Sequence, residues 1–245
     1  MSLAYNQIEQ FKLDGYVYVG PIVTSDELVA LRTAYDRIFA AKERPASFRE
    51  LGLKEGETTA KLSVMQVIDM WRLDDTFRAV FSKSEVLDMV EILMGTTNIR
   101  LYHDQALYKP AFHGDEVPWH QDNSYWKFDP ANAVSCWMAL DDVDEENGCM
   151  RIIPGSHRNG GIGHQTAGRS LALLATEVDE SQAVPLPMPA GCAMFHHCLT
   201  LHNTKPNRTP RQRRAWAIHY IPADAKQNGK PLPERLLVRG EALVT

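Results

Sequence analysis

Two pairs of side chains in this chain have the types and the spacing needed to bind a metal ion. His120 and Asp122 lie two residues apart, so on an extended segment the imidazole and the carboxylate point to the same side. His113 and Asp115 have the same spacing. In a chain with nine histidines such a pair arises by chance roughly 0.6 times, so the spacing alone does not identify a site.

A third histidine supplies the rest of a possible metal site. His202 follows the apolar run 193–201 and precedes the polar segment 203–208. Two histidines and one carboxylate on one face of a metal leave three coordination positions free, which is the arrangement used by non-haem Fe(II) oxygenases. The residue types therefore favour a metal centre with the open positions that oxygen chemistry requires.

The elements that must position these residues change in character along the chain. Residues 24–27 can form a capping box for a helix that reaches residue 39, Ser84 and Gly95 bound a second helix, and a short strand is expected at 16–19. From residue 98 onward the pattern predicts strands at 99–108, 134–140, 149–153, 193–201 and 213–221. Helices followed by strands predict an α+β, mainly β domain built on a sandwich or barrel.

Composition narrows the class of protein. The 245 residues are 44% hydrophobic with a formal net charge of −5, and no GxGxxG or GKS/T nucleotide-binding element is present. The N-terminus has no signal-like pattern and no apolar run is long enough to cross a membrane, so we expect a cytoplasmic protein. The mild acidity argues against nucleic-acid binding. The cysteines show no CxxC spacing and are expected as buried thiols: Cys136, Cys149, Cys192 and Cys198.

Several segments, taken in order, resemble one known family: the phytanoyl-CoA dioxygenase-like (PhyH) branch of the Fe(II)/2-oxoglutarate-dependent oxygenases. The matching segments are 14–17 (DGYV), 104–110 (DQALYKP), 119–122 (WHQD), 137–142 (WMALDD), 147–157 (NGCMRIIPGSH) and 202–213. The resemblance implies a double-stranded β-helix, or cupin-like jelly-roll, core with flanking N-terminal helices, in agreement with the predicted order of elements. We expect one domain, with a mainly helical flank at 1–97, the jelly-roll core at 98–222 and a C-terminal extension at 223–245.

The resemblance also selects the metal ligands. The family's His-x-Asp pair follows a Lys-Pro segment after an intervening loop, which fits His120 and Asp122 and leaves His113 and Asp115 in the loop. With His202 they are the expected ligands of Fe(II). Family members that halogenate replace the carboxylate with a small residue, so the presence of Asp122 argues against halogenation.

In this family an arginine on the last core strand holds the far carboxylate of 2-oxoglutarate, and three arginines compete for that role. Arg213 lies on the same strand face as two alanines, which leave room for a ligand, whereas Arg214 lies on the opposite face. The offset of Arg213 from His202 matches the family best, and Arg214 is the second choice. A guanidinium suits the role because its planar fork can grip a carboxylate with two hydrogen bonds.

The resemblance assigns further neighbours to the cosubstrate and the substrate. The expected cosubstrate neighbours are Thr204, Trp137, Gln105 and Tyr102. The expected rim of the substrate mouth is formed by Trp119, Tyr125, Trp126, Arg151 and His157.

The implied activity is oxidation of an unactivated C–H bond in a small-molecule metabolite. The implied cofactors are Fe(II), 2-oxoglutarate and O₂, and succinate and CO₂ are formed. Hydroxylation is the default outcome, and ring closure, epoxidation or desaturation in a biosynthetic pathway uses the same ligands. We expect a polar small-molecule substrate and no nucleic-acid or membrane partner, and the sequence leaves the oligomeric state open.

Two other functions are compatible with the same three ligands. One is a cupin-like hydrolase or isomerase that uses another metal and no 2-oxoglutarate. The other is a family member that binds a small ligand without turnover. Intact His120, Asp122, His202 and Arg213 favour the oxygenase over both.

Overall fold

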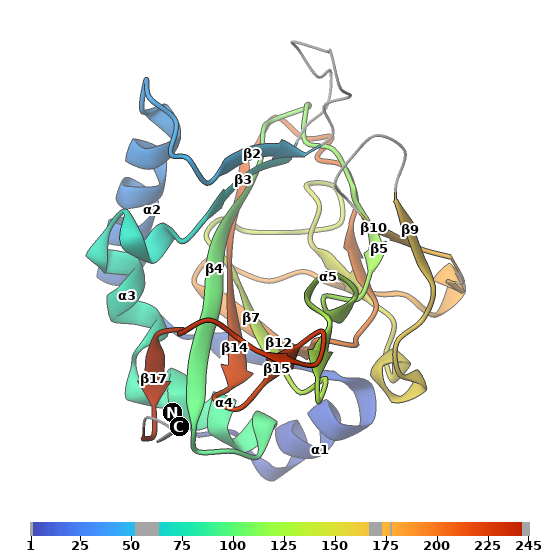
Figure 1. Ribbon diagram of the computed structural model, residues 1–245. Helices are drawn as coiled ribbons and strands as arrows, with labels where there is room; N and C mark the ends of the chain where they lie inside the picture. The colour runs from blue at the N-terminus through green and yellow to red at the C-terminus, as the bar shows by residue number, and fades with distance from the viewer. Residues whose placement is uncertain (1, 52–63, 167–172, 177, 242–245) are drawn as a thin grey trace.

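Two antiparallel sheets face each other in the computed structural model, which describes residues 2–51, 64–166, 173–176 and 178–241 (Figure 1). The main sheet runs in the order β1-β12-β7-β14-β4-β3-β2, and β17 also pairs with β4. Its strands are β1 (Tyr16–Pro21), β2 (Phe48–Leu51), β3 (Val64–Ile68), β4 (Ile99–Lys109), β7 (Val134–Ala139), β12 (Cys192–His197), β14 (Arg213–Pro222) and β17 (Leu237–Arg239).

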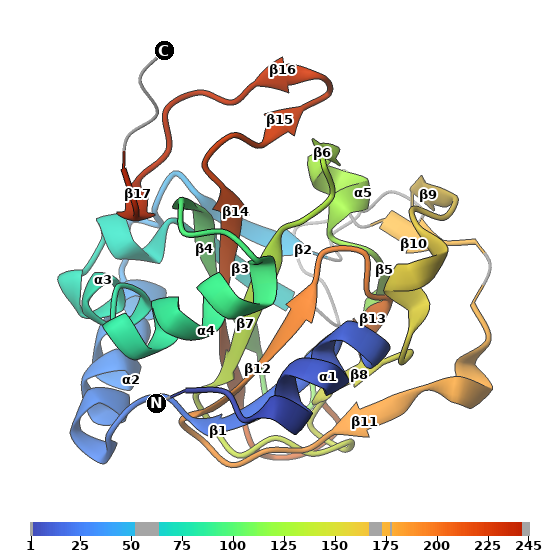
Figure 2. The same cartoon turned by 90° about the horizontal axis from the view of Figure 1, so that it is seen from below.

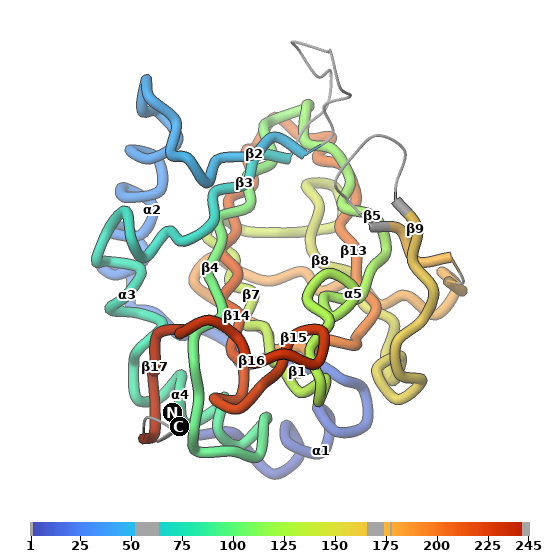
Figure 3. The backbone as a smooth tube through the Cα atoms, viewed as in Figure 1, coloured from blue at the N-terminus to red at the C-terminus, as the bar shows by residue number. Residues whose placement is uncertain are grey.

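The small sheet is formed by β11 (Val184–Leu186), β8 (Met150–Ile152), β13 (His202–Thr204) and β5 (Val117–His120), in that order. Two minor pairings lie beside it. The first joins β9 (His164–Thr166) to β10 (Leu173–Ala175), and the second joins β6 (Phe128–Asp129), β15 (Lys226–Gln227) and β16 (Lys230–Pro231). Figure 3 shows the β15–β16 hairpin close to α5 (Asn123–Trp126), where Gln227 Nε2 donates to the Trp126 carbonyl at 2.8 Å.

Helices α2 (Ser25–Ala40), α3 (Asp75–Phe81) and α4 (Ser84–Met94) cover the face of the main sheet that points away from the small sheet (Figure 2). Their apolar residues form one core with the outward side chains of β14, including Leu31, Phe77, Trp216, Ile218 and Tyr220. The predicted capping box at the start of α2 is confirmed, because Thr24 and Glu27 exchange side-chain to backbone hydrogen bonds. Among the described residues, no helix is long and apolar enough to span a membrane.

The first 97 residues are less purely helical than expected. Besides α1 (Tyr5–Asp14), the three covering helices and β1, which was expected at 16–19, they supply β2 and β3 to the main sheet. Strands β2 and β3 are short and only partly buried, so their sequences lack the strict alternation that marks a half-buried strand. All four cysteines are buried free thiols, as predicted.

Candidate metal and cosubstrate site

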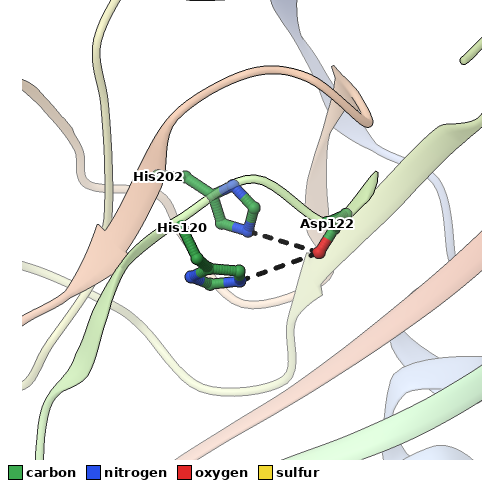
Figure 4. A group of neighbouring side chains, drawn as sticks. All are labelled: His120, Asp122 and His202. Carbon is green, nitrogen blue, oxygen red and sulfur yellow. Dashed lines mark ion pairs between the residues drawn. The ribbon is translucent and has the colours of Figure 1, made fainter. Parts of the chain in front are cut away.

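The side chains of His120, Asp122 and His202 converge between the two sheets (Figure 4). His120 ends β5 and is paired in register with His202 at the start of β13, while Asp122 lies just before α5. Nε2 of each histidine is 3.7 Å from Asp122 Oδ1. One ligand atom from each residue lies within 4.8 Å of the others, and all three residues are buried. This geometry suits a single metal ion.

Backbone carbonyls fix the orientation of both imidazoles. His120 Nδ1 is 2.8 Å from the Pro118 carbonyl oxygen, and His202 Nδ1 is 2.9 Å from the Thr200 carbonyl oxygen. A carbonyl oxygen only accepts, so each Nδ1 carries the hydrogen and each Nε2 presents a lone pair toward Asp122. Burial lowers the pKa of His202 well below its usual value, which favours the neutral form that binds metals.

The two carboxylate oxygens of Asp122 have different surroundings. Oδ1 faces the two histidines, whereas Oδ2 accepts a hydrogen bond from Ser135 Oγ at 2.8 Å. The hydrogen bond from Ser135 favours the ionised form of this carboxyl. One anionic and two neutral ligands fit a divalent ion with open coordination positions.

A cavity of about 400 Å³ opens beside the three ligands. The predicted site residues that line it are His120, Asp122, His202, Arg213, Thr204, Trp137, Gln105, Tyr102, Tyr125 and Trp126. Both sheets contribute to the wall, because Gln105 lies on β4, Trp137 on β7 and Thr204 on β13.

Arg213 is a buried cation in this cavity, with 1% of its surface exposed. Its Nη1 donates to the Leu107 carbonyl at 3.2 Å, its guanidinium lies 5.8 Å from the Trp137 ring centroid, and no described acid forms an ion pair with it. Burial lowers the pKa of Arg213 to about 10, so the group stays protonated at neutral pH. A buried charge without an acidic partner is costly, which points to an anionic ligand.

The two competing arginines already have acidic partners. Arg214 lies on the outer face of β14, where it contacts Asp141 at 2.6 Å and Asp36 at 2.8 Å. Arg211 pairs with Asp144 at the surface. The predicted alternation along β14 holds, because Arg213 lines the cavity while Trp216 packs in the core under the helices.

Comparison with known proteins shows the family of this chain. A model of the phytanoyl-CoA dioxygenase (PhyH) family matches residues 11–215. The chain belongs to the phytanoyl-CoA dioxygenase family. It is 26% identical over 243 residues to the peroxisomal phytanoyl-CoA dioxygenase of Rattus norvegicus, and this match covers 91% of the chain and 70% of the rat protein.

Solved structures share the fold of this chain. The non-haem alpha-ketoglutarate-dependent carbocyclase SnoK from nogalamycin biosynthesis has a TM-score of 0.77 at 22% identity, covering 96% of this chain and 95% of SnoK. EvdO2 from Micromonospora carbonacea var. aurantiaca, complexed with 2-oxoglutarate, has a TM-score of 0.74 at 25% identity, covering 95% and 96%. The predicted phytanoyl-CoA dioxygenase family, jelly-roll fold and dioxygenase class are thus confirmed.

Three residues expected at the substrate mouth of this dioxygenase do not line the cavity. Trp119 precedes His120 on β5 and therefore faces the other way, where it packs in a separate apolar cluster. Arg151 lies over the Trp119 ring at 5.3 Å and pairs with Glu180. His157 contacts α1 instead, where its Nε2 donates to the Lys12 carbonyl at 3.2 Å. Strand alternation and local turns direct these side chains away from the cavity, and their role at the substrate rim stays a prediction.

Polar side chains that the motifs did not identify also lie close to Asp122 in this family member. His196 Nε2 lies 3.9 Å from Asp122 Oδ2, while the adjacent His197 faces His157 on the other side of β12. His219 and Ser135 lie close to Asp122 on neighbouring strands. Alternation was the available signal, because Ser135 shares a face with Trp137, whose cavity position was expected.

Lys109 supports the end of β13 through hydrogen bonds to its backbone. It is fully buried, and its Nζ donates to the Thr204 carbonyl at 3.1 Å and to the Lys205 carbonyl. The side chain therefore fixes the strand segment that carries Thr204.

Proposed function

We propose that this protein is an Fe(II)/2-oxoglutarate-dependent dioxygenase that oxidises an unactivated C–H bond of a small-molecule metabolite. The observation that carries the proposal is that one cavity joins the three-ligand cluster to Arg213, a buried cation with no acidic partner among the described residues. A metal site and an anion site in one cavity suit a dicarboxylate that binds the metal at one end and the arginine at the other.

His120, Asp122 and His202 are proposed to hold the metal through the two Nε2 atoms and Oδ1. Iron(II) with 2-oxoglutarate and O₂ supplies the oxidising chemistry when bound, with formation of succinate and CO₂. The hydrogen bonds from His120 and His202 to backbone carbonyls hold both rings in position before the metal arrives, which lowers the cost of binding.

Arg213 is proposed to hold the far carboxylate of 2-oxoglutarate. Its Nε and the Thr204 hydroxyl are both buried without a hydrogen-bond partner among the described residues, so both are available to a ligand oxygen. Trp137 forms the wall beside the guanidinium and excludes water from this ion pair. Exclusion of water strengthens the attraction between the two charges.

The remaining part of the cavity is proposed to bind the substrate. Tyr102 and Gln105 keep their predicted place beside the cosubstrate. The rest of the wall presents aromatic rings and polar groups from Tyr125 and Trp126. Such a surface suits a compact polar metabolite better than a long aliphatic chain. SnoK acts in nogalamycin biosynthesis, and we infer that this chain likewise acts in a biosynthetic pathway, by hydroxylation, ring closure or desaturation. A cytoplasmic location without nucleic-acid or membrane partners stays a prediction.

Calorimetric titration of 2-oxoglutarate into Mn(II)-loaded protein tests the anion site. Removal of one partner from a buried charge pair costs about 2–5 kcal/mol, so Arg213→Ala should weaken 2-oxoglutarate binding by about 30-fold or more. Arg211→Ala is the matched control, because this neighbouring arginine pairs with Asp144 at the surface and should bind 2-oxoglutarate like the wild type. Equal affinities in Arg213→Ala and the wild type would refute the assignment.

A further inference from the structure

A buried chain of hydrogen bonds continues from the metal-ligand carboxylate to a histidine outside the ligand set. Ser135 Oγ lies 2.8 Å from Asp122 Oδ2 and 2.7 Å from His219 Nδ1. The exposed fractions are 7% for Asp122, 0% for Ser135 and 2% for His219. Ser135 on β7 and His219 on β14 are paired in register, so the sheet itself sets their separation.

The direction of each hydrogen bond follows from the chemistry of the three groups. An ionised carboxylate only accepts, so the single hydrogen of the Ser135 hydroxyl must point to Asp122 Oδ2. The hydroxyl oxygen then accepts from His219, whose Nδ1 must carry a hydrogen. His219 thereby prevents Ser135 from turning its hydrogen away from Asp122.

The packing around His219 keeps the ring in this orientation. Its centroid lies 4.6 Å from that of His103 and 4.7 Å from that of Trp126, in tilted and edge-on arrangements. Burial lowers the pKa of His219 to about 4, which is consistent with a neutral ring that carries its one hydrogen on Nδ1. Its Nε2 has no hydrogen-bond partner in the described part of the chain. Among the described residues, the hydrogen bond from Nδ1 to Ser135 is therefore the one that orients the ring.

We propose that Ser135 and His219 are positioning residues that hold Asp122 Oδ2 away from the metal, so that Asp122 binds through Oδ1 alone. The inference rests on the proposed metal site. With Oδ2 held by Ser135, the carboxylate occupies one coordination position instead of two. This leaves the positions that the cosubstrate and oxygen need. His196 cannot replace the serine in the present arrangement, because its Nε2 is 3.9 Å from Oδ2, too far for a hydrogen bond.

Two substitutions of His219 separate a positioning role from simple packing. In His219→Asn the side-chain amide nitrogen occupies the place of Nδ1 and can still donate to Ser135. In His219→Gln the longer side chain places its amide nitrogen nearer the position of Nε2, so the donor to Ser135 is lost. Ser135→Ala removes the link itself.

Two measurements on the metal-free protein test this role without turnover. Titration with Co(II) gives the metal affinity, and infrared difference spectra of the carboxylate stretches give the binding mode of Asp122. Loss of a hydrogen-bond partner of a metal ligand typically costs about 10–100-fold in metal affinity. We expect such a loss in Ser135→Ala and His219→Gln, together with a change from a monodentate to a bidentate carboxylate pattern. His219→Asn should retain wild-type affinity and the monodentate pattern.

The outcomes distinguish this inference from the proposed function. If the wild type fails to bind Co(II) and Asp122→Ala changes nothing, the metal site itself is wrong. If the wild type binds Co(II) while His219→Asn, His219→Gln and Ser135→Ala all match its affinity and infrared pattern, the positioning role is refuted. An ¹⁵N NMR spectrum of the metal-free protein that shows an unprotonated Nδ1 on His219 would also refute it.

Discussion

Adjacent arginines on one strand have opposite surroundings. Arg213 faces the cavity with no described acidic partner, whereas Arg214 faces outward and contacts Asp141 and Asp36. The difference follows from strand alternation, which a sequence can reveal, and from the position of Asp36 on α2, which it cannot. The alternation predicted correctly which arginine lies in the cavity.

Arg214→Ala should therefore affect stability and leave ligand binding unchanged. Hydrogen bonds to charged groups contribute about 1.5–3 kcal/mol each when buried, and Arg214 is 7% exposed. We expect the free energy of unfolding to fall by about 2 kcal/mol in urea titrations. The affinity of Arg214→Ala for 2-oxoglutarate should equal that of the wild type, and a large loss of affinity with unchanged stability would contradict this division of roles.

At the scale of elements, the interface between the main sheet and the helices contains a buried carboxyl. Asp104 on β4 accepts a hydrogen bond from Trp216 Nε1 at 2.7 Å and is completely buried. Burial raises the pKa of Asp104 from 3.8 to about 7. The unfolded chain loses this proton at lower pH than the folded chain, so the contribution of Asp104 to stability declines as the pH rises from about 4 to 7.

Asp104→Asn should remove this part of the pH dependence. The amide oxygen can still accept from Trp216 Nε1, but the residue no longer titrates. Urea unfolding across about pH 4 to 8 should show that the variant gains stability relative to the wild type as the pH rises. A constant difference between the two proteins over this range would contradict the raised pKa.

The sequence predicted the elements with strong local signals and missed those that depend on tertiary contacts. The start of α2 was correct because Thr24 and Glu27 form a local capping box. Strands β2 and β3 were missed because pairing makes them strands: β3 pairs with β4, more than thirty residues away, and β2 pairs with β3. Propensity alone does not report such long-range pairing.

At the scale of the whole molecule, the fold brings distant motifs to one cavity. His120 and His202 lie on paired strands, although they are 82 positions apart in the sequence. The family resemblance predicted the metal ligands and the arginine, and all four side chains line one cavity. It did not use alternation from His120, which turns the Trp119 ring to the other face of β5, and it could not show that Arg151 pairs with Glu180. It also gave no indication of Ser135, which becomes relevant only through its neighbours in the sheet.

The most direct test of the central claim is anaerobic titration of metal-free protein with Fe(II) and then with 2-oxoglutarate, monitored by visible absorption. Chelation of the iron by 2-oxoglutarate should produce a metal-to-ligand charge-transfer band in the wild type. Asp122→Ala should lose the band, and Arg213→Ala should require a higher 2-oxoglutarate concentration to develop it. A wild-type protein that binds Fe(II) at the three ligands but develops no band with 2-oxoglutarate would contradict the proposed function.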